Sequence, residues 1–77
     1  MKYYVGIHTE SAHEVPVLKK VRKIKSVEEA FRVYGFYDVI AKLNTGSEIA
    51  LKKIVTEDIN GIESVRGAST LILGSKE

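Results

Sequence analysis

The residues best suited to bind a small molecule lie in one turn, within residues 33–42 (Val-Tyr-Gly-Phe-Tyr-Asp-Val-Ile-Ala-Lys). Gly35 can adopt a positive φ without a Cβ penalty, and Asp38 can accept a hydrogen bond from a backbone amide two residues on and so hold the loop. The loop would then present backbone amides, an aromatic ring and a carboxylate on one stiff rim. Glycine and aspartate are also common in ordinary hairpin turns, so the turn alone fits either a binding site or a simple connection.

No catalytic or metal-binding set is apparent in the sequence. His8 and His13 fall on a predicted strand and at a predicted helix start, with no third ligand at metal-binding spacing. Glu28 and Glu29 are neighbours on a predicted strand, so they point to opposite faces and cannot share one proton transfer. A glycine-rich phosphate loop and a Gly-x-Ser-x-Gly motif are also missing. We therefore predict a protein that is not an enzyme and uses no cofactor or metal.

Length and composition indicate one small domain. The sequence has 77 residues, no cysteine and a net charge of +2. A chain of this length buries only about 60% of its unfolded surface, so self-association would add needed stability. Disulfides are excluded, and the sequence contains neither a secretory signal nor an apolar run of about 18 residues. These features predict a cytoplasmic protein with no membrane segment.

The first helix is predicted from a polar start followed by an apolar stripe. Ser11 and Glu14 have the spacing of a capping box, which would satisfy two amides at the helix start. Pro16 is favourable in a first turn and costly further in, so the start of this helix around Pro16 stays open. The residues expected to face the core recur at helical spacing and are Val15, Leu18, Val21 and Ile24.

The second helix has clearer boundaries. Ser47 is a plausible N-cap, and Glu48 in the first turn suits the helix dipole. Gly61 stands where a left-handed C-terminal cap is expected. The predicted buried stripe consists of Leu51, Ile54, Val55 and Ile59.

Alternating apolar residues predict strands at residues 2–9, 27–34, 38–44 and 65–73. The order is therefore strand, helix, strand, strand, helix, strand. With right-handed crossovers, this order gives an α+β, ferredoxin-like βαββαβ sandwich, in which a four-stranded antiparallel sheet carries both helices on one face. Each strand also carries apolar groups on its second face, which a monomer rarely exposes. We expect a homodimer that closes these open sheet faces.

Nucleic acid binding is a weaker interpretation of the same sequence. The basic residues Lys19, Lys20, Arg22, Lys23 and Lys25 could neutralise phosphates, but several of them form the solvated side of the first helix. The fold order is shared with RNA-recognition domains, which stack bases on aromatic residues of central strands. Residues 39–43 contain no aromatic residue. We expect no direct DNA binding.

Residues 33–42 resemble the effector-binding RAM domain of the Lrp/AsnC (feast/famine) transcription regulators. The similarity extends along nearly the whole chain, through the blocks VLKKVRKIKSVEEAFRVYG, LKKIVTEDINGIESV and STLIL. Regulators of this family carry an N-terminal helix-turn-helix domain, whereas this sequence begins at the first strand. It therefore resembles a stand-alone RAM protein, with residues 1–77 forming a single ligand-binding and oligomerisation domain.

The resemblance implies dimers that join into octamer-like rings and bind a small amino acid between dimers. The family's Gly-x-Tyr-Asp turn corresponds here to Gly35, Tyr37 and Asp38. The hydroxyls of the last strand, often Thr-x-Thr, correspond to Ala68-Ser-Thr70, where Thr70 matches and Ser69 is a substitute. Phe36 replaces a residue that is commonly polar, and it could narrow the pocket or strengthen dimer–dimer contact. The ligand-binding residues expected on this basis are Gly35, Phe36, Tyr37, Asp38, Ser69 and Thr70.

Three functional hypotheses follow. In the first, the chain binds an amino acid or related small metabolite and modulates transcription or metabolism. In the second, it is a ligand-free assembly partner that joins full-length Lrp/AsnC regulators and changes their oligomers. A third, a small enzyme of the dimeric α+β barrel kind, would need a closed pocket and a base, and neither His8 nor His13 is an obvious one.

Overall fold

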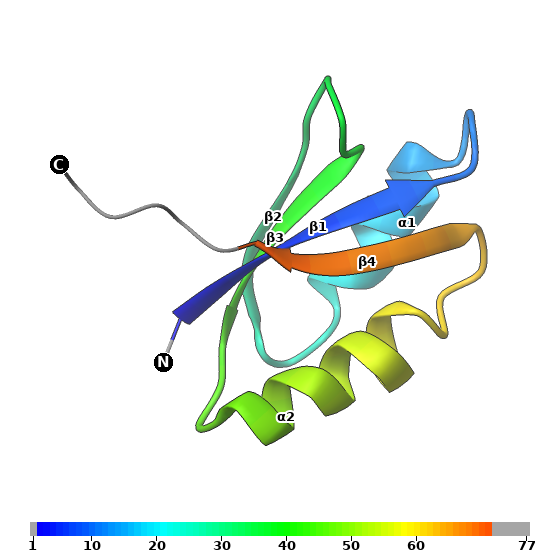
Figure 1. The fold of residues 1–77 in the computed structure, drawn as a ribbon. Coiled ribbons are helices and arrows are strands. Elements are labelled where there is room, and N and C mark those ends of the chain that lie inside the picture. Colours follow the sequence, from blue (N-terminus) through cyan, green and yellow to red (C-terminus); the bar gives the residue numbers. More distant parts are fainter. Residues whose placement is uncertain (1, 72–77) are drawn as a thin grey trace, which may run out of the picture.

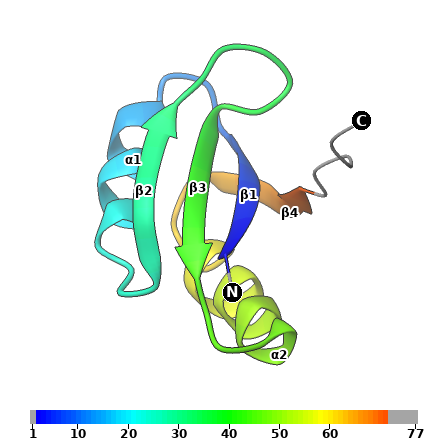
Figure 2. The same ribbon diagram turned by 90° about the vertical axis from the view of Figure 1, so that its left-hand side faces the viewer.

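The computed structural model describes residues 2–71 and confirms the predicted order of elements (Figure 1). The elements are β1 (Lys2–Thr9), α1 (Glu14–Arg22), β2 (Val27–Arg32), β3 (Val39–Asn44), α2 (Glu48–Lys53), its π-helical continuation η1 (Ile54–Ile59), and β4 (Val65–Leu71). The four strands form one antiparallel sheet in the order β2-β3-β1-β4. Figure 2 shows β2, β3 and β1 side by side, with α1 running along β2. The fold is the predicted ferredoxin-like sandwich.

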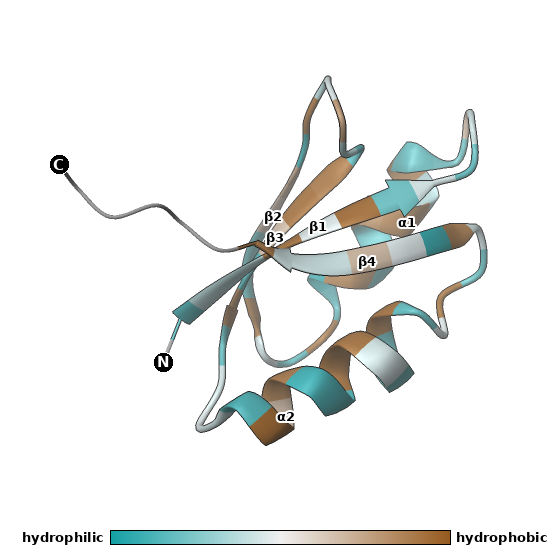
Figure 3. Cartoon of the chain, viewed as in Figure 1, coloured by the Kyte–Doolittle hydropathy of each residue, from teal (hydrophilic) through white to brown (hydrophobic). Residues whose placement is uncertain are grey.

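The core lies between the helices and one face of the sheet. Alternate residues of the central strands, including Val5, Ile7 and Leu43, are fully buried there. They pack with Val17 and Val21 of α1 and, from the second helix, Leu51 and Ile59. In Figure 3 the ribbon of α2 alternates between hydrophobic and hydrophilic residues, as expected for a helix with one buried side. Strand alternation therefore decides which side chains remain on the opposite face.

The predicted capping box of the first helix is wrong. The N-cap is His13, and no side chain caps this helix. Ser11 instead lies in a tight turn, closed by a hydrogen bond from His13 N to Glu10 O (3.0 Å) and by a positive φ at Ala12. Because the helix starts at Glu14, Pro16 lies in the first turn, where its missing N–H leaves no helical bond unmade.

The predicted apolar stripe of α1 is also partly wrong. Val15 is 46% exposed, and Val17 is buried in its place. Leu18 and Val21 are buried as expected. The contact of α1 with β2 and β3 decides which side of the helix is covered. Helical spacing alone could not choose between Val15 and Val17.

The second helix confirms its predicted start and corrects its predicted end. Ser47 Oγ accepts a hydrogen bond from Ala50 N (3.1 Å), as an N-cap does. Gly61 does not have the predicted left-handed conformation, because the helix widens into η1 and closes through a bond from Asn60 N to Val55 O (3.0 Å). A Cβ at Gly61 would lie 2.5 Å from Glu57 O. Glycine is needed there for close packing, not for its backbone angles.

The strand boundaries differ slightly from those predicted. β2 ends at Arg32 instead of residue 34, and β3 begins at Val39. The hydrogen bond from Val33 N to Asp38 O (3.0 Å) closes a longer turn between them. For the last strand, residues 72 and 73 lie outside the described part of the chain.

The second face of the sheet is not covered by either helix, and we call it the open face. As predicted, each strand places an apolar side chain there, namely Tyr4, Phe31, Ile40 and Leu71. Ion pairs also lie on this face, joining Lys42 to Glu29 (3.8 Å) and Lys2 to Glu28 (3.5 Å). Within residues 2–71, no helix combines the length and the hydropathy of a membrane-spanning segment.

Candidate functional site

Asp38 is held by hydrogen bonds to the end of β1. Its amide donates to Ile7 O (3.0 Å), and its carboxylate Oδ2 accepts from Thr9 N (2.8 Å). The prediction that Asp38 holds its own loop by binding an amide two residues on is wrong. The carboxylate instead accepts the hydrogen bond of Thr9 N that a carbonyl group of β3 would accept in a longer sheet. The last regular pair of these two strands, Ile7 with Val39, lies just before it. The bond from Thr9 N fixes the carboxylate at the edge of the sheet where β1 ends and β3 begins.

Tyr37 lies across Gly6 on the open face. A Cβ at Gly6 would be 2.6 Å from Tyr37 Cδ1, so only glycine allows the ring to pack directly on β1. Gly6 lies within β1 and pairs with Ile40 and Ser69. A glycine inside a strand often marks a close approach, and this signal could have pointed to Gly6, though not to its partner.

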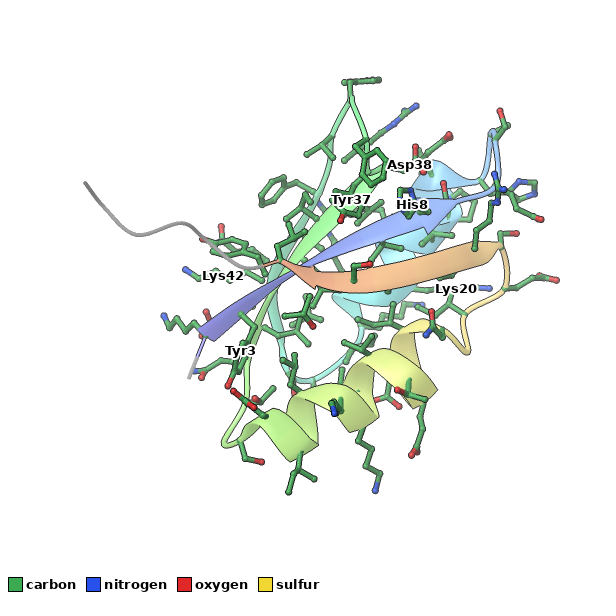
Figure 4. The ribbon with its side chains drawn as sticks, viewed as in Figure 1. Tyr3, His8, Lys20, Tyr37, Asp38 and Lys42 are labelled. Carbon is green, nitrogen blue, oxygen red and sulfur yellow. The ribbon has the colours of Figure 1, made fainter. Side chains whose placement is uncertain are left out.

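His8 joins Tyr37 and Phe36 in an aromatic cluster. Its ring centroid lies 4.8 Å from that of Tyr37 and 5.0 Å from that of Phe36, and the two phenyl rings are 5.0 Å apart in an edge-to-face arrangement. Figure 4 shows His8, Tyr37 and Asp38 gathered at one end of the sheet, with Lys42 and Tyr3 toward the other. Phe36 nevertheless remains 80% exposed. Tyr37 thus packs the turn against β1, while the apolar side chain of Phe36 stays exposed at its tip.

A hollow of about 330 Å³ lies beside Asp38 and is lined by His8, Thr9, Asp38 and Arg66. Arg66 reaches this position from β4, where the pairing with β1 shifts between His8 and Thr9. Gly67 pairs with His8 and Val65 with Thr9, so Arg66 is the extra residue of a β-bulge. No sequence pattern identified Arg66, because the bulge depends on how two distant strands pair.

The remaining predicted ligand residues lie in different places. Gly35 has φ +142°, so the turn requires a glycine there. Ser69 pairs with Gly6 and therefore shares the open face with Tyr37. Thr70 pairs with Val5 and belongs to the opposite face, where it lines a separate hollow of about 440 Å³ against α2. Within one protomer the structure brings Ser69, but not Thr70, to the side of the turn.

The other polar groups considered from the sequence have local roles. His13 Nδ1 lies 3.0 Å from Ser11 O, and Arg22 Nε donates to Ala30 O (2.9 Å) on β2. Lys19 and Lys20 are exposed on α1, and Lys23 is exposed at its C-cap. Among residues 2–71, no group of three or more His, Cys, Asp or Glu side chains is arranged to hold a metal ion.

The sheet order, the helices on one face and the turn that contains Asp38 define an α+β module of ferredoxin-like architecture. The chain belongs to the Lrp/AsnC ligand binding domain family, whose model matches residues 2–76. The similarity covers nearly the whole of the sequence, as the quoted blocks predicted.

Individual relatives agree with this assignment. The regulatory protein AsnC of Escherichia coli (strain K12) is 30% identical over 71 residues, which cover 91% of this chain and 47% of AsnC. The proline dehydrogenase transcriptional activator of Rhizobium radiobacter is 34% identical over 53 residues, covering 69% of this chain and 34% of the activator. The chain therefore spans between about a third and a half of the length of these curated relatives, one a regulatory protein and the other a transcriptional activator.

Solved structures show the same fold. The crystal structure of FFRP-DM1 has a TM-score of 0.84 at 30% identity and covers 94% of this chain and 96% of its own. The structure of E. coli AsnC has a TM-score of 0.85 at 26% identity, covering 97% of this chain and 51% of AsnC. The fold of residues 2–71 is thus that of the ligand-binding part of this family.

Proposed function

We propose that this chain is a regulatory module that binds an amino acid or a related small metabolite beside Asp38 and modulates transcription or metabolism through its oligomers. The observation that carries this proposal is the fixed Asp38 carboxylate, oriented by Thr9 N at the rim of a hollow. The family relationship supports it, because the matching family is described as ligand binding.

The chemistry of the turn suits a zwitterion. A carboxylate already held by a backbone N–H can accept a further, charge-assisted hydrogen bond from a ligand ammonium. Backbone amides of the turn are available as donors to a ligand carboxylate. We assign the site to Gly35, Phe36, Tyr37, Asp38 and Ser69. Thr70, which lies on the other face of β4, stays a prediction.

A homodimer through the open face is part of this proposal. The apolar side chains Tyr4, Phe31, Ile40 and Leu71 lie on this face, and neither α1 nor α2 packs on it. Burying them against a second copy would remove a large apolar patch from water. The opposite charges of Lys42 and Glu29 on this face pair with one another.

The proposed regulation is a population shift. Dimers would join into a larger, octamer-like ring, with the ligand at the junction between dimers. Phe36 at the exposed tip of the turn would contact the neighbouring dimer. A ligand at that junction favours one oligomer only if it binds that oligomer better than the others.

A second candidate function is that of a ligand-free assembly partner of full-length regulators. The family relationship supports it, because a shared fold could form mixed dimers with other members of the family. A tagged copy should then recover a helix-turn-helix relative from its own cells, and recovery of the chain alone would count against this function.

The test of the first function is thermal unfolding with each of the twenty amino acids, with oligomer mass measured by light scattering. A ligand at about 100 times its Kd adds roughly 2.7 kcal/mol of stability. The Asp38→Asn variant keeps an oxygen acceptor for Thr9 N but loses the charge, so it should fold normally and lose the ligand-induced shift. Asp58→Asn, an exposed site on η1, is the matched control. An unchanged shift in Asp38→Asn would contradict the assigned site.

A further inference from the structure

We propose that Arg66 binds the carboxylate of the ligand, opposite Asp38, so that the hollow selects free amino acids carrying both an ammonium and a carboxylate group. This inference rests on the proposed function and adds to it a residue of β4 outside the predicted site.

The β-bulge is the first step of the argument. In a regular strand, neighbouring side chains point to opposite faces, so the Arg66 side chain would point away from the face on which Gly67 lies. The shift in pairing between His8 and Thr9 leaves Arg66 without a partner residue on β1. Bulges re-aim a side chain in this way and are common beside functional sites. Arg66 is exposed and lines the same hollow as Asp38.

The second step is the placement of opposite charges on two sides of β1. Asp38 directly precedes β3, Arg66 belongs to β4, and β1 runs between these strands. Strands two places apart in a sheet are separated by about 10 Å, so Asp38 and Arg66 flank the end of β1. Neither forms an ion pair with another residue in the described range 2–71. Both charges are therefore available to a bound molecule.

Thr9 gives a third, independent observation. It lines the hollow and is only 6% exposed, yet its Oγ1 has no hydrogen-bond partner among the described residues. Buried hydroxyl groups normally have a partner. The residue whose backbone N–H orients Asp38 thus also carries a buried hydroxyl group that is unpaired within residues 2–71.

The pair of charges decides the ligand class. A simple anion would pair with Arg66 but meet the negative charge of Asp38. A simple cation would pair with Asp38 but meet the positive charge of Arg66. A free amino acid satisfies both, because a guanidinium binds a carboxylate with two parallel hydrogen bonds and Asp38 accepts from the ammonium. The carboxylate group of the ligand should therefore contribute to affinity through Arg66.

The experiment uses isothermal titration calorimetry with whichever amino acid gives the largest shift in the unfolding panel, together with its carboxamide, which lacks the carboxylate. The intact protein should bind the acid at least tenfold more tightly than the carboxamide. Arg66→Gln should bind the acid at least tenfold more weakly and should lose most of this preference, because the guanidinium that pairs with the ligand carboxylate is gone. Arg66→Lys should recover part of the affinity for the acid and part of the preference over the carboxamide.

Lys20→Gln is the matched control, since it removes one positive charge from an exposed position on α1. It should keep the affinity and the preference of the intact protein. Circular dichroism and oligomer mass would verify that Arg66→Gln folds and assembles as the intact protein does.

The outcomes separate this inference from the proposed function. If Arg66→Gln keeps the full preference for the acid while Asp38→Asn loses binding, the role of Arg66 is wrong and the proposed function stands. If the intact protein binds the carboxamide as tightly as the acid, the role of Arg66 is also wrong. If no amino acid binds at all, the proposed function and this inference fail together.

Discussion

The two ends of the open face treat their charges differently. At the end where β1 begins, Lys2 pairs with Glu28 (3.5 Å), and Asn44 Nδ2 donates to the same carboxylate (3.2 Å). Lys42 pairs with Glu29 nearby (3.8 Å). At the end where β1 finishes, Asp38 and Arg66 line one hollow without an ion-pair partner among residues 2–71.

This difference separates charges that stabilise the sheet from charges that can bind a ligand. Charges that neutralise one another across neighbouring strands favour the pairing of those strands and offer little to a ligand. Charges of opposite sign that flank a hollow, one of them oriented by a backbone N–H, keep their binding capacity. The candidate site therefore lies at the end of the sheet that carries Asp38 and Arg66. The other end is expected to have a purely structural role.

The largest effect is expected for Gly6→Ala, which challenges the packing of the turn end. The added Cβ would overlap the Tyr37 ring at 2.6 Å, so the turn must move away from β1. We expect a loss of about 1–3 kcal/mol in the free energy of unfolding, together with loss of ligand binding. Denaturant unfolding followed by circular dichroism measures the first effect.

Gly67→Ala is the matched control for Gly6→Ala. Gly67 lies on the adjacent strand and pairs with His8, but a Cβ at this position meets nothing within 4 Å. Its stability should stay close to that of the intact protein. Equal destabilisation by the two substitutions would contradict the close packing of Tyr37 on Gly6.

The next effect concerns the hydrogen bond that orients Asp38. Asp38→Ala removes the acceptor of the partly buried Thr9 N–H and should destabilise the protein by about 1–3 kcal/mol. Asp38→Asn keeps an acceptor for Thr9 N and should lower the free energy of unfolding by a smaller amount. Hydrogen exchange at the Thr9 amide should become faster in Asp38→Ala than in Asp38→Asn, and similar rates would show that the bond does not protect this amide.

A smaller effect is expected at the ion-pair end. Lys42→Gln, Glu29→Gln and the double variant form a double-mutant cycle whose coupling energy should be below about 1 kcal/mol, because Glu29 is largely exposed. Ligand affinity should not change in any of these variants. A loss of ligand binding in Lys42→Gln would break the proposed division between the two ends.

The smallest effect on stability is expected for Phe36→Ser at the tip of the turn. Because Phe36 is 80% exposed, the free energy of unfolding should change by no more than about 0.5 kcal/mol. Association of dimers should nevertheless weaken, which sedimentation at several protein concentrations can detect. Unchanged association would remove Phe36 from the proposed junction between dimers.

Local patterns predicted much of the fold but only part of the candidate site. The alternation in β1 and β3 and the cap at Ser47 depend on neighbours within a few residues, and the structure confirms them. The choice of Val17 over Val15 and the closure of the second helix at Gly61 depend on packing between elements, and those predictions failed. The boundary at Asp38 shifted for the same reason, because its partner is on β1.

The sequence by itself determined the order of the elements, the two faces of the sheet and the glycine-containing turn at residues 33–38, because periodicity and turn chemistry act over short separations. Only the tertiary structure decided that Tyr37 covers Gly6 and that Thr9, 29 residues away, orients Asp38. It also decided that a bulge brings Arg66 to the same hollow. These contacts join β1 to the turn and to β4, and their geometry exists only once the register of the sheet is set.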